Sequence, residues 1–290
     1  MIARVFPRRT AATPNDEYAF VGEPPFIEFL PPDITEIHIS VTFSWDIPFA
    51  RHLEQSWRRI APVKIGGPAF GSPALEFQPG MYLKPGYLFT SRGCPNFCWF
   101  CDVPRREGPL RELEIKEGWN ILDSNLLACY EQHIRKVFDM LSRRKEKVLL
   151  TGGLEAERLR EWHIELFEAV KVQEAFFAYD LPDDIPALRQ AAKILTKSTW
   201  YRERKVRCYV LCGYDGDTPE AAEKRCKNVL ELGYYPFAMF YRDSQGQSNK
   251  SHEWAAMQQK WTRPAAISSI KKKLNSEQNP ETFFNLPLGI

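Results

Sequence analysis

Strand-like and helix-like segments alternate along the chain from residue 86 onward, and no other feature of the sequence constrains the fold as much. Short apolar runs are expected to form strands at 86–90, 119–122, 147–150, 175–179, 206–212 and 236–241. Amphipathic helical stretches separate most of these runs, and one begins at Pro219 with Thr218 as its N-cap. Repeated strand–helix units predict an α/β fold with a parallel sheet.

A smaller α/β unit is expected before this region. Strands are predicted at 37–41 and 63–68, and prolines through the first 33 residues leave room there for one or two short strands. The helix between the two predicted strands is expected to be apolar on the face that carries Phe49, Leu53, Trp57 and Ile60. The predicted organisation is an amino-terminal α/β unit at 1–83, a core at 84–243 and a carboxyl-terminal helical tail at 244–290.

Three cysteines, Cys94, Cys98 and Cys101, lie directly after the first predicted strand of the core with the spacing C-x3-C-x2-C. Thiolates are the ligands that soft metals and iron–sulfur clusters select, so a metal centre is predicted in this loop. The alternative is a non-catalytic iron–sulfur or zinc protein. No second C-x2-C or H-x3-H pair stands at zinc-finger spacing, so a fourth zinc ligand would come from the remaining cysteines. These are Cys129, Cys208, Cys212 and Cys226.

With the aromatic Phe100 directly before Cys101, this loop resembles the radical S-adenosylmethionine (SAM) superfamily, whose C-x3-C-x-aromatic-C motif follows the first strand of a partial (β/α)6 barrel. The resemblance covers roughly residues 84–243. It implies that Cys94, Cys98 and Cys101 hold a [4Fe-4S] cluster whose open iron binds SAM. Reductive cleavage of SAM then gives a 5′-deoxyadenosyl radical that abstracts hydrogen from a substrate. The same resemblance implies an electron donor such as a flavodoxin or a ferredoxin.

The resemblance also points to residues at the carboxyl ends of the predicted strands, where barrels of this kind carry their chemistry. Asp123 and Asn125 resemble an Asp-x-Asn ending of the second strand in cobalamin-type members. Gly152, Gly153 and Glu155 resemble a Gly-Gly-Glu motif that contacts the amino group of SAM, with a leucine inserted before the glutamate. The residues alone also allow a helix cap at 123–125 and a tight turn at 152–153.

Further cofactor contacts are implied at the ends of later strands and in the cysteine loop. Asp180 stands where the family often places a polar group toward the SAM ribose, and Gly213 stands where the fifth strand passes the adenine. A turn at Asp180 and ordinary packing at Gly213 are the alternatives. The complete set of predicted cofactor-binding residues is Phe100, Asp123, Asn125, Gly152, Gly153, Glu155, Asp180 and Gly213.

The amino-terminal unit resembles one piece of the cobalamin-binding domain that precedes many radical SAM cores, because its second predicted strand ends in a Gly-Gly-Pro turn at 66–68. A D-x-H-x-x-G element, which supplies the cobalt ligand in that family, is not found in the sequence. Cobalamin is therefore not expected, and the unit is interpreted as a truncated domain that caps the core.

Composition limits the remaining function classes. The 290 residues carry a net charge of +2, which gives no strong argument for nucleic acid. The look-alikes are uncharacterised proteins of phage and prophage settings, so a nucleotide or nucleic-acid substrate is kept as a candidate. A run of 18 apolar residues and a secretion signal are both missing from the sequence, which favours a cytoplasmic protein with no membrane partner. Seven cysteines also fit a reducing compartment.

Overall fold

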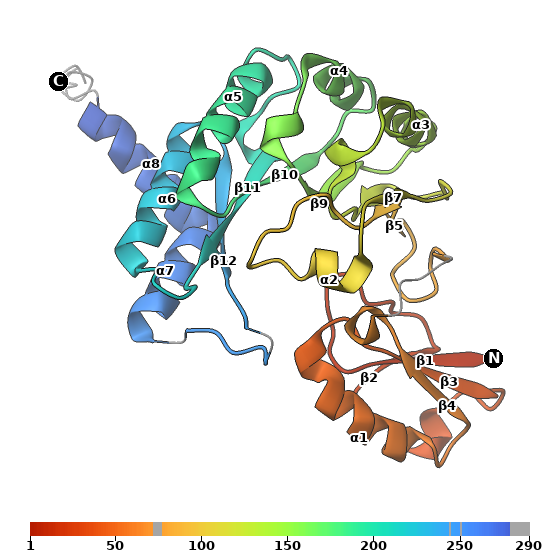
Figure 1. Cartoon of the computed structure of the whole chain (residues 1–290). Coiled ribbons are helices and arrows are strands. Elements are labelled where there is room, and N and C mark those ends of the chain that lie inside the picture. The colour runs from red at the N-terminus through yellow and green to blue at the C-terminus, as the bar shows by residue number, and fades with distance from the viewer. Residues whose placement is uncertain (72–76, 244, 250, 279–290) are drawn as a thin grey trace, which may run out of the picture.

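A computed structural model of the chain describes residues 1–71, 77–243, 245–249 and 251–278, and it contains two parallel β-sheets that each carry helices (Figure 1). The predicted α/β fold is confirmed. The two sheets have separate hydrophobic cores, one between residues 3 and 61 and one between residues 88 and 267. In the part of the chain that is described, no helix is long and apolar enough to cross a membrane.

The amino-terminal sheet has the strand order β2-β1-β3-β4, and all its strands are parallel. Its strands are β1 (Ile2–Phe6), β2 (Ala19–Val21), β3 (Glu36–Ser40) and β4 (Val63–Gly66). Helix α1 (Ile47–Trp57) connects β3 to β4 and buries Ala50, Leu53 and Trp57. Phe49 was expected on this buried face but is 41% exposed, because the buried stripe of α1 runs through Ala50 instead.

The second sheet has six parallel strands in the order β12-β11-β10-β9-β8-β5. Across the sheet, the strands therefore follow the same order as along the chain. These strands are β5 (Tyr87–Leu88), β8 (Asn120–Ile121), β9 (Leu149–Leu154), β10 (Glu174–Tyr179), β11 (Val206–Cys212) and β12 (Tyr235–Phe240). Each of the six predicted strands is present, and β11 has the predicted bounds.

Helices follow the strands of the six-stranded sheet one by one. They are α3 (Glu131–Ser142), α4 (Glu161–Ala169), α5 (Ile185–Thr196) and α6 (Pro219–Glu231). Parallel crossovers are nearly always right-handed, so a sheet whose strands keep chain order receives these helices on one face. Figure 1 shows them side by side along the outer side of the sheet. These four helices therefore cover one face of the sheet.

The predicted helix boundaries are confirmed in one place and wrong in another. Thr218 caps α6, because its side chain accepts a hydrogen bond from the Ala221 N–H and Pro219 is the first helical residue. The helix expected to carry Leu127 and Tyr130 on its apolar face begins only at Glu131. Leu127 lies in a preceding 3-10 turn, and Tyr130 is 82% exposed at the N-cap.

Two carboxyl-terminal helices, α7 (His252–Thr262) and α8 (Pro264–Gln278), extend the core of the six-stranded sheet. Trp254, Met257 and Trp261 of α7 are buried in that core, and α7 contacts β12. The described part of the predicted tail is thus continuous with the core. Residues 244, 250 and 279–290 of that tail lie outside the described residues.

Short elements complete the fold. A two-stranded antiparallel ribbon pairs β6 (Ser91–Arg92) with β7 (Arg111–Glu112), and α2 (Val103–Glu107) lies between the two strands. Single-turn 3-10 helices lie at Ile27–Phe29, Ser44–Asp46, Pro68–Phe70, Leu126–Ala128, Ala156–Arg158, Pro182–Asp184 and Glu203–Lys205. The ribbon and α2 frame the loop that holds the three clustered cysteines.

Candidate metal centre

The cysteine loop, residues 93–102, runs from the end of β6 to the start of α2. Its three cysteines are free thiols, with Cys98 exposed and Cys94 and Cys101 partly buried. The Cys101 N–H donates to the carbonyl oxygen of Cys98 at 3.0 Å, so the second half of the loop is a tight turn. The loop thus carries all three thiols between β6 and α2.

The three thiols interact electrostatically. Burial raises the pKa of the Cys98 thiol above its ordinary value, and the neighbouring Cys101 and Cys94 raise it further. Burial also raises the pKa of Cys101, with Cys94 again contributing. Thiols that oppose one another's ionisation become good ligands when a cation removes the repulsion, because metal coordination deprotonates them. The arrangement fits a metal or an iron–sulfur cluster in this respect.

The side chains do not form a closed metal cage. Within residues 1–71, 77–243, 245–249 and 251–278, no group of three or more His, Cys, Asp or Glu side chains has the arrangement of a metal site. The ligand set Cys94, Cys98 and Cys101 therefore stays a prediction that rests on the shared loop and on the mutual effect of the thiols.

Asp123, at the end of β8, holds the chain just before the cysteine loop. Its carboxylate is 1% exposed and accepts hydrogen bonds from the Thr90 N–H at 2.6 Å, from the Thr90 hydroxyl and from the Ser91 hydroxyl at 2.7 Å. Burial raises the pKa of Asp123, and these bonds oppose that rise. Both carboxylate oxygens accept hydrogen bonds from Thr90 and Ser91. This geometry supports a role for Asp123 in holding the chain rather than in a direct contact with SAM.

Glu107, the last residue of α2, ties both ends of the cysteine loop together. Its buried carboxylate accepts hydrogen bonds from the Gly93 N–H at 3.1 Å and from Arg92 at 3.2 Å. Arg106 and the Ser124 hydroxyl also donate to it, at 3.1 Å and 3.2 Å. The first residue of the loop, the helix that follows it and the end of β8 therefore meet at one carboxylate.

Asn125 contacts the thiol of Cys94 directly. Its side-chain Nδ2 lies 3.5 Å from the Cys94 Sγ and 2.6 Å from the carboxylate of Glu155. Glu155 also accepts a hydrogen bond from the Nε of Arg158 at 2.5 Å. The Asn125 side chain is buried, and its Oδ1 has no hydrogen-bond partner in the described part of the chain. This orphaned acceptor beside a cysteine sulfur fits a site that a bound group completes.

The glycines at the end of β9 have different structural roles. A Cβ on Gly152 would lie 2.2 Å from the carbonyl oxygen of Asp123 and 2.4 Å from the carbonyl carbon of Leu122, so Gly152 allows β9 to approach β8 closely. Gly153 has a φ of +97° with open space around the missing side chain. Close packing of the backbone explains why position 152 is a glycine. At Gly153, by contrast, the space beside the backbone is open.

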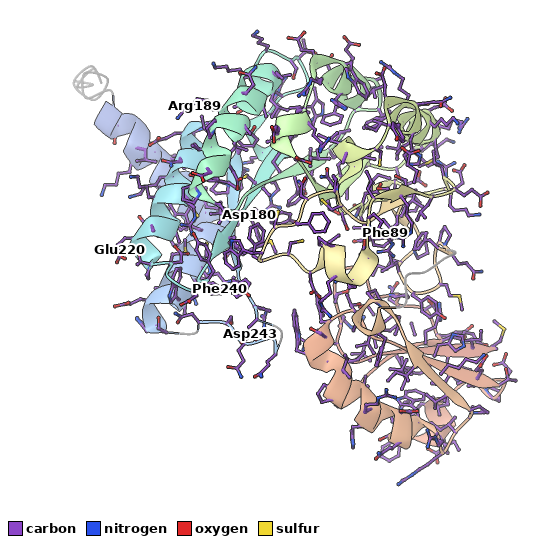
Figure 2. All side chains as sticks on the ribbon, viewed as in Figure 1. Phe89, Asp180, Arg189, Glu220, Phe240 and Asp243 are labelled. Atoms are coloured by element: carbon purple, nitrogen blue, oxygen red, sulfur yellow. The ribbon has the colours of Figure 1, made fainter. Side chains whose placement is uncertain are left out.

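Asp180 directly follows β10 and is labelled in Figure 2. Its backbone N–H donates to the carboxylate of Asp184 at 3.0 Å, so Asp180 also begins a turn, as one interpretation of the sequence proposed. Burial raises the pKa of Asp180 to about 7, and the nearby Asp184 contributes. The negative charge of Asp180 in turn raises the pKa values of Cys98 and Cys101, so this side chain lies near the cysteine loop.

Aromatic side chains from the cysteine loop itself and from two strand ends meet at Trp99. The ring of Trp99 contacts Phe100, Tyr214 after β11 and Tyr241 after β12, with centroids 5.4, 5.6 and 5.8 Å apart. Gly213 has a φ of +75°, and its N–H donates to Asp217 at 2.9 Å. The structure thus brings the loop and the ends of β11 and β12 together, as a shared site requires.

The cysteines outside the loop lie elsewhere. Cys208 and Cys212 of β11 are fully buried, and the Cys226 thiol on α6 interacts with both. Cys208 and Cys212 therefore lie on the side of β11 that packs against α6. Cys129 is also buried, and burial raises its pKa to about 12.

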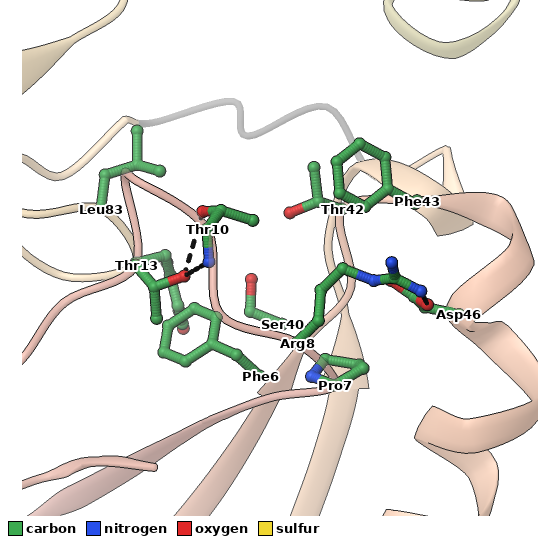
Figure 3. A pocket seen from close by; sticks show the side chains of 11 residues that line it. Phe6, Pro7, Arg8, Thr10, Thr13, Ser40, Thr42, Phe43, Asp46 and Leu83 are labelled. Carbon is green, nitrogen blue, oxygen red and sulfur yellow. Dashed lines mark hydrogen bonds and ion pairs between the residues drawn. The ribbon is translucent and has the colours of Figure 1, made fainter. Parts of the chain in front are cut away.

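A small cavity lies in the amino-terminal sheet (Figure 3). It has a volume of about 20 Å³, and it opens between the ends of β1 and β3, where Phe6 and Ser40 line it. Arg8 forms an ion pair with the buried Asp46 at its edge. This volume holds about one water molecule.

Compared with known proteins, the chain matches no protein-family model and no curated protein sequence.

Proposed function

We propose that the chain is a radical SAM enzyme in which Cys94, Cys98 and Cys101 hold a [4Fe-4S] cluster. The observation that carries this proposal is the clamp formed by residues 123–125 on the cysteine loop. Asp123 accepts a hydrogen bond from Thr90, which precedes the loop, and Ser124 donates one to Glu107, which follows the loop. Asn125 contacts the Cys94 sulfur. Contacts that fix the loop at both ends orient its three thiols, as expected for metal ligands and not for a chance cluster of cysteines.

The sheet supports the same proposal. Six parallel strands in chain order are compatible with the partial (β/α)6 barrel that the proposal implies. The first strand leads into the cysteine loop, and the second strand supplies residues 123–125 that clamp it. The candidate site therefore lies at the carboxyl ends of the strands, where barrels place their ligands.

The residues of the candidate site have different roles in this proposal. The three thiolates would hold the cluster. Asp180, whose charge acts on the Cys98 thiol, and the aromatic group around Trp99 lie next to the same loop. The chemistry that such a centre supplies is one-electron reduction of SAM, which yields a 5′-deoxyadenosyl radical. Burial and the aromatic rings serve to exclude water from that radical.

The amino-terminal unit closes one side of the same region. Trp45 lies against Gly246 in the segment after β12, because a Cβ on Gly246 would lie 2.4 Å from the Trp45 ring. The guanidinium of Arg242 lies 5.7 Å from the same ring. This contact joins the unit that precedes the core to the segment that follows its last strand, and it supports the interpretation of the unit as a cap. A flavodoxin or ferredoxin is proposed as the electron donor.

The test is anaerobic reconstitution with iron and sulfide, followed by reduction with SAM present and an assay for 5′-deoxyadenosine. The wild-type protein is expected to bind about four irons per chain, to show the electron paramagnetic resonance signal of a reduced [4Fe-4S] cluster and to cleave SAM. Cys98→Ala should lose all three properties. Cys226→Ala makes the same chemical change in the core and should retain them.

Two outcomes oppose the proposal. A wild-type protein that binds zinc and cleaves no SAM would favour the non-catalytic metal protein instead. Equal iron binding by Cys98→Ala and the wild-type chain would remove the cysteine loop as the ligand set. Substrate identification, with nucleotides and nucleic acids among the candidates, follows only from a positive result.

A further inference from the structure

A chain of polar side chains runs across three strand ends to the sulfur of Cys94. Arg158 donates to Glu155, Glu155 accepts from Asn125, and Asn125 lies 3.5 Å from the Cys94 Sγ. The members come from the cysteine loop after β6 and from the segments that follow β8 and β9. Since these segments follow separate strands, the ends of the strands fix where the amide of Asn125 lies.

The partners also decide which way this amide faces. An Asn side chain can be turned so that its oxygen and nitrogen exchange places, and only its hydrogen-bond partners distinguish the two orientations. The Glu155 carboxylate, held by Arg158, can only accept, so the nitrogen of Asn125 must face it. The same nitrogen then directs its second N–H toward the Cys94 sulfur, and Oδ1 points away from both.

We propose that Asn125 is a positioning residue that donates an N–H···S hydrogen bond to Cys94 and thereby raises the reduction potential of the cluster held by the loop. This inference rests on the proposed function. Hydrogen bonds to the sulfurs are among the factors that set iron–sulfur potentials, because they stabilise the form with more negative charge on sulfur. Reduction adds that negative charge, so the bond favours the reduced cluster.

The experiment is a redox titration of the reconstituted protein, followed by the electron paramagnetic resonance signal of the reduced cluster. Asn125→Ala is expected to shift the midpoint potential to a more negative value. A tenfold loss in the equilibrium constant for reduction corresponds to about 59 mV for a one-electron couple. The matched control is Thr151→Ala, which removes the 2.6 Å hydrogen bond from Thr151 to Asn120 between the same two strands, β8 and β9. Its potential should equal that of the wild-type protein.

The outcomes separate this inference from the proposed function. A wild-type chain that assembles no iron–sulfur cluster refutes the proposed function and removes the basis of the inference. A wild-type chain with a cluster, and an Asn125→Ala variant with equal iron content and equal potential, refutes the inference alone. If Asn125→Ala does not fold or does not keep its iron, Asn125→Ser, whose hydroxyl is too short to reach both partners, is titrated and judged by the same shift.

Discussion

The carboxylate of Glu107 accepts a hydrogen bond from the backbone N–H of Gly93, 3.1 Å away, and this contact closes the loop that carries the three clustered cysteines. Burial alone would raise the pKa of Glu107, but the Gly93 N–H and the positive charges of Arg92 and Arg106 outweigh it and lower that pKa. Arg92, also buried, has this carboxylate as its ionic partner at 3.2 Å. The loop is thus closed by an ion pair inside the protein.

We expect Glu107→Gln to reduce the free energy of unfolding by about 3 kcal/mol, because removing one partner of a buried ion pair leaves the other charge unpaired. Urea denaturation followed by circular dichroism measures this change. Amide hydrogen exchange at residues 93–107 should also become faster. Glu114→Gln is the control, because Glu114 is exposed and pairs with Lys116 at the surface. Equal stability of the two variants would contradict the role given to Glu107.

Gly152 should be much less tolerant of a side chain than Gly66. A methyl group on Gly152 would meet the backbone of Asp123, just after β8, at 2.2 Å, whereas one on Gly66 at the end of β4 would have nothing within 4 Å. Gly152→Ala is therefore expected to destabilise the protein by about 1–3 kcal/mol, the usual range for overpacking, and Gly66→Ala by much less. Thermal melts of both variants measure the difference, and equal melting temperatures would show that β8 and β9 separate without cost.

His163 should make stability depend on pH between about 4 and 6.5. Burial lowers its pKa from 6.5 to about 4, although its Nδ1 accepts a hydrogen bond from the Arg160 N–H at 2.9 Å. The unfolded chain therefore binds a proton at His163 before the folded chain does. Stability falls as the pH drops from 6.5 toward 4, by up to about 3 kcal/mol.

The variant that isolates this effect is His163→Gln, because glutamine at the third helical position can still accept the bond that caps α4 but does not titrate. Chemical denaturation at pH 7 and pH 5 should show a smaller loss of stability in His163→Gln than in the wild-type protein. A parallel loss in both proteins would mean that other groups cause the acid sensitivity.

The buried ion pair between Arg225 and Asp217 should contribute to the turn after β11. The two groups are 2.7 Å apart and almost fully buried, and Arg225 also donates to the Leu211 carbonyl. Asp217→Asn is expected to cost about 3–5 kcal/mol, since it leaves the arginine charge unpaired in the interior. Asp139→Asn breaks an exposed pair with Arg143 and serves as the control, with little effect on the melting temperature.

Much of the fold could be predicted from the sequence because apolar runs and glycine turns report directly on strands. The six core strands and the cap of α6 by Thr218 were found in this way. The errors at Phe49 and Tyr130 have one cause. A helical spacing identifies a stripe of apolar residues, but a residue at the edge or start of the helix can match the spacing and still face solvent.

The candidate site was less predictable than the fold. Asp123 and Asn125 were predicted as cofactor-binding residues. The structure shows Asp123 bonded to the chain just before the cysteine loop and Asn125 beside Cys94, and a linear motif does not reveal either contact. Glu107 and Arg92 were missed. Charged residues around a loop are usually exposed, and only the folded chain shows that these two are buried against each other. The one signal in the sequence was the position of Glu107 at the end of a short basic segment, Arg105 and Arg106.

The coincidence of chain order and spatial order in the six-stranded sheet has a consequence during synthesis. Each new strand can pair with the strand made just before it, so the sheet can grow as the chain leaves the ribosome. The cysteine loop, however, is made before the residues that hold it, because Cys94 precedes Asn125 by 31 positions. At 5–20 residues per second, the three thiols are exposed without their clamp for roughly 2–6 seconds. A nascent chain therefore exposes the three thiols before residues 123–125, which hold the loop and its flank in the folded chain, have been made.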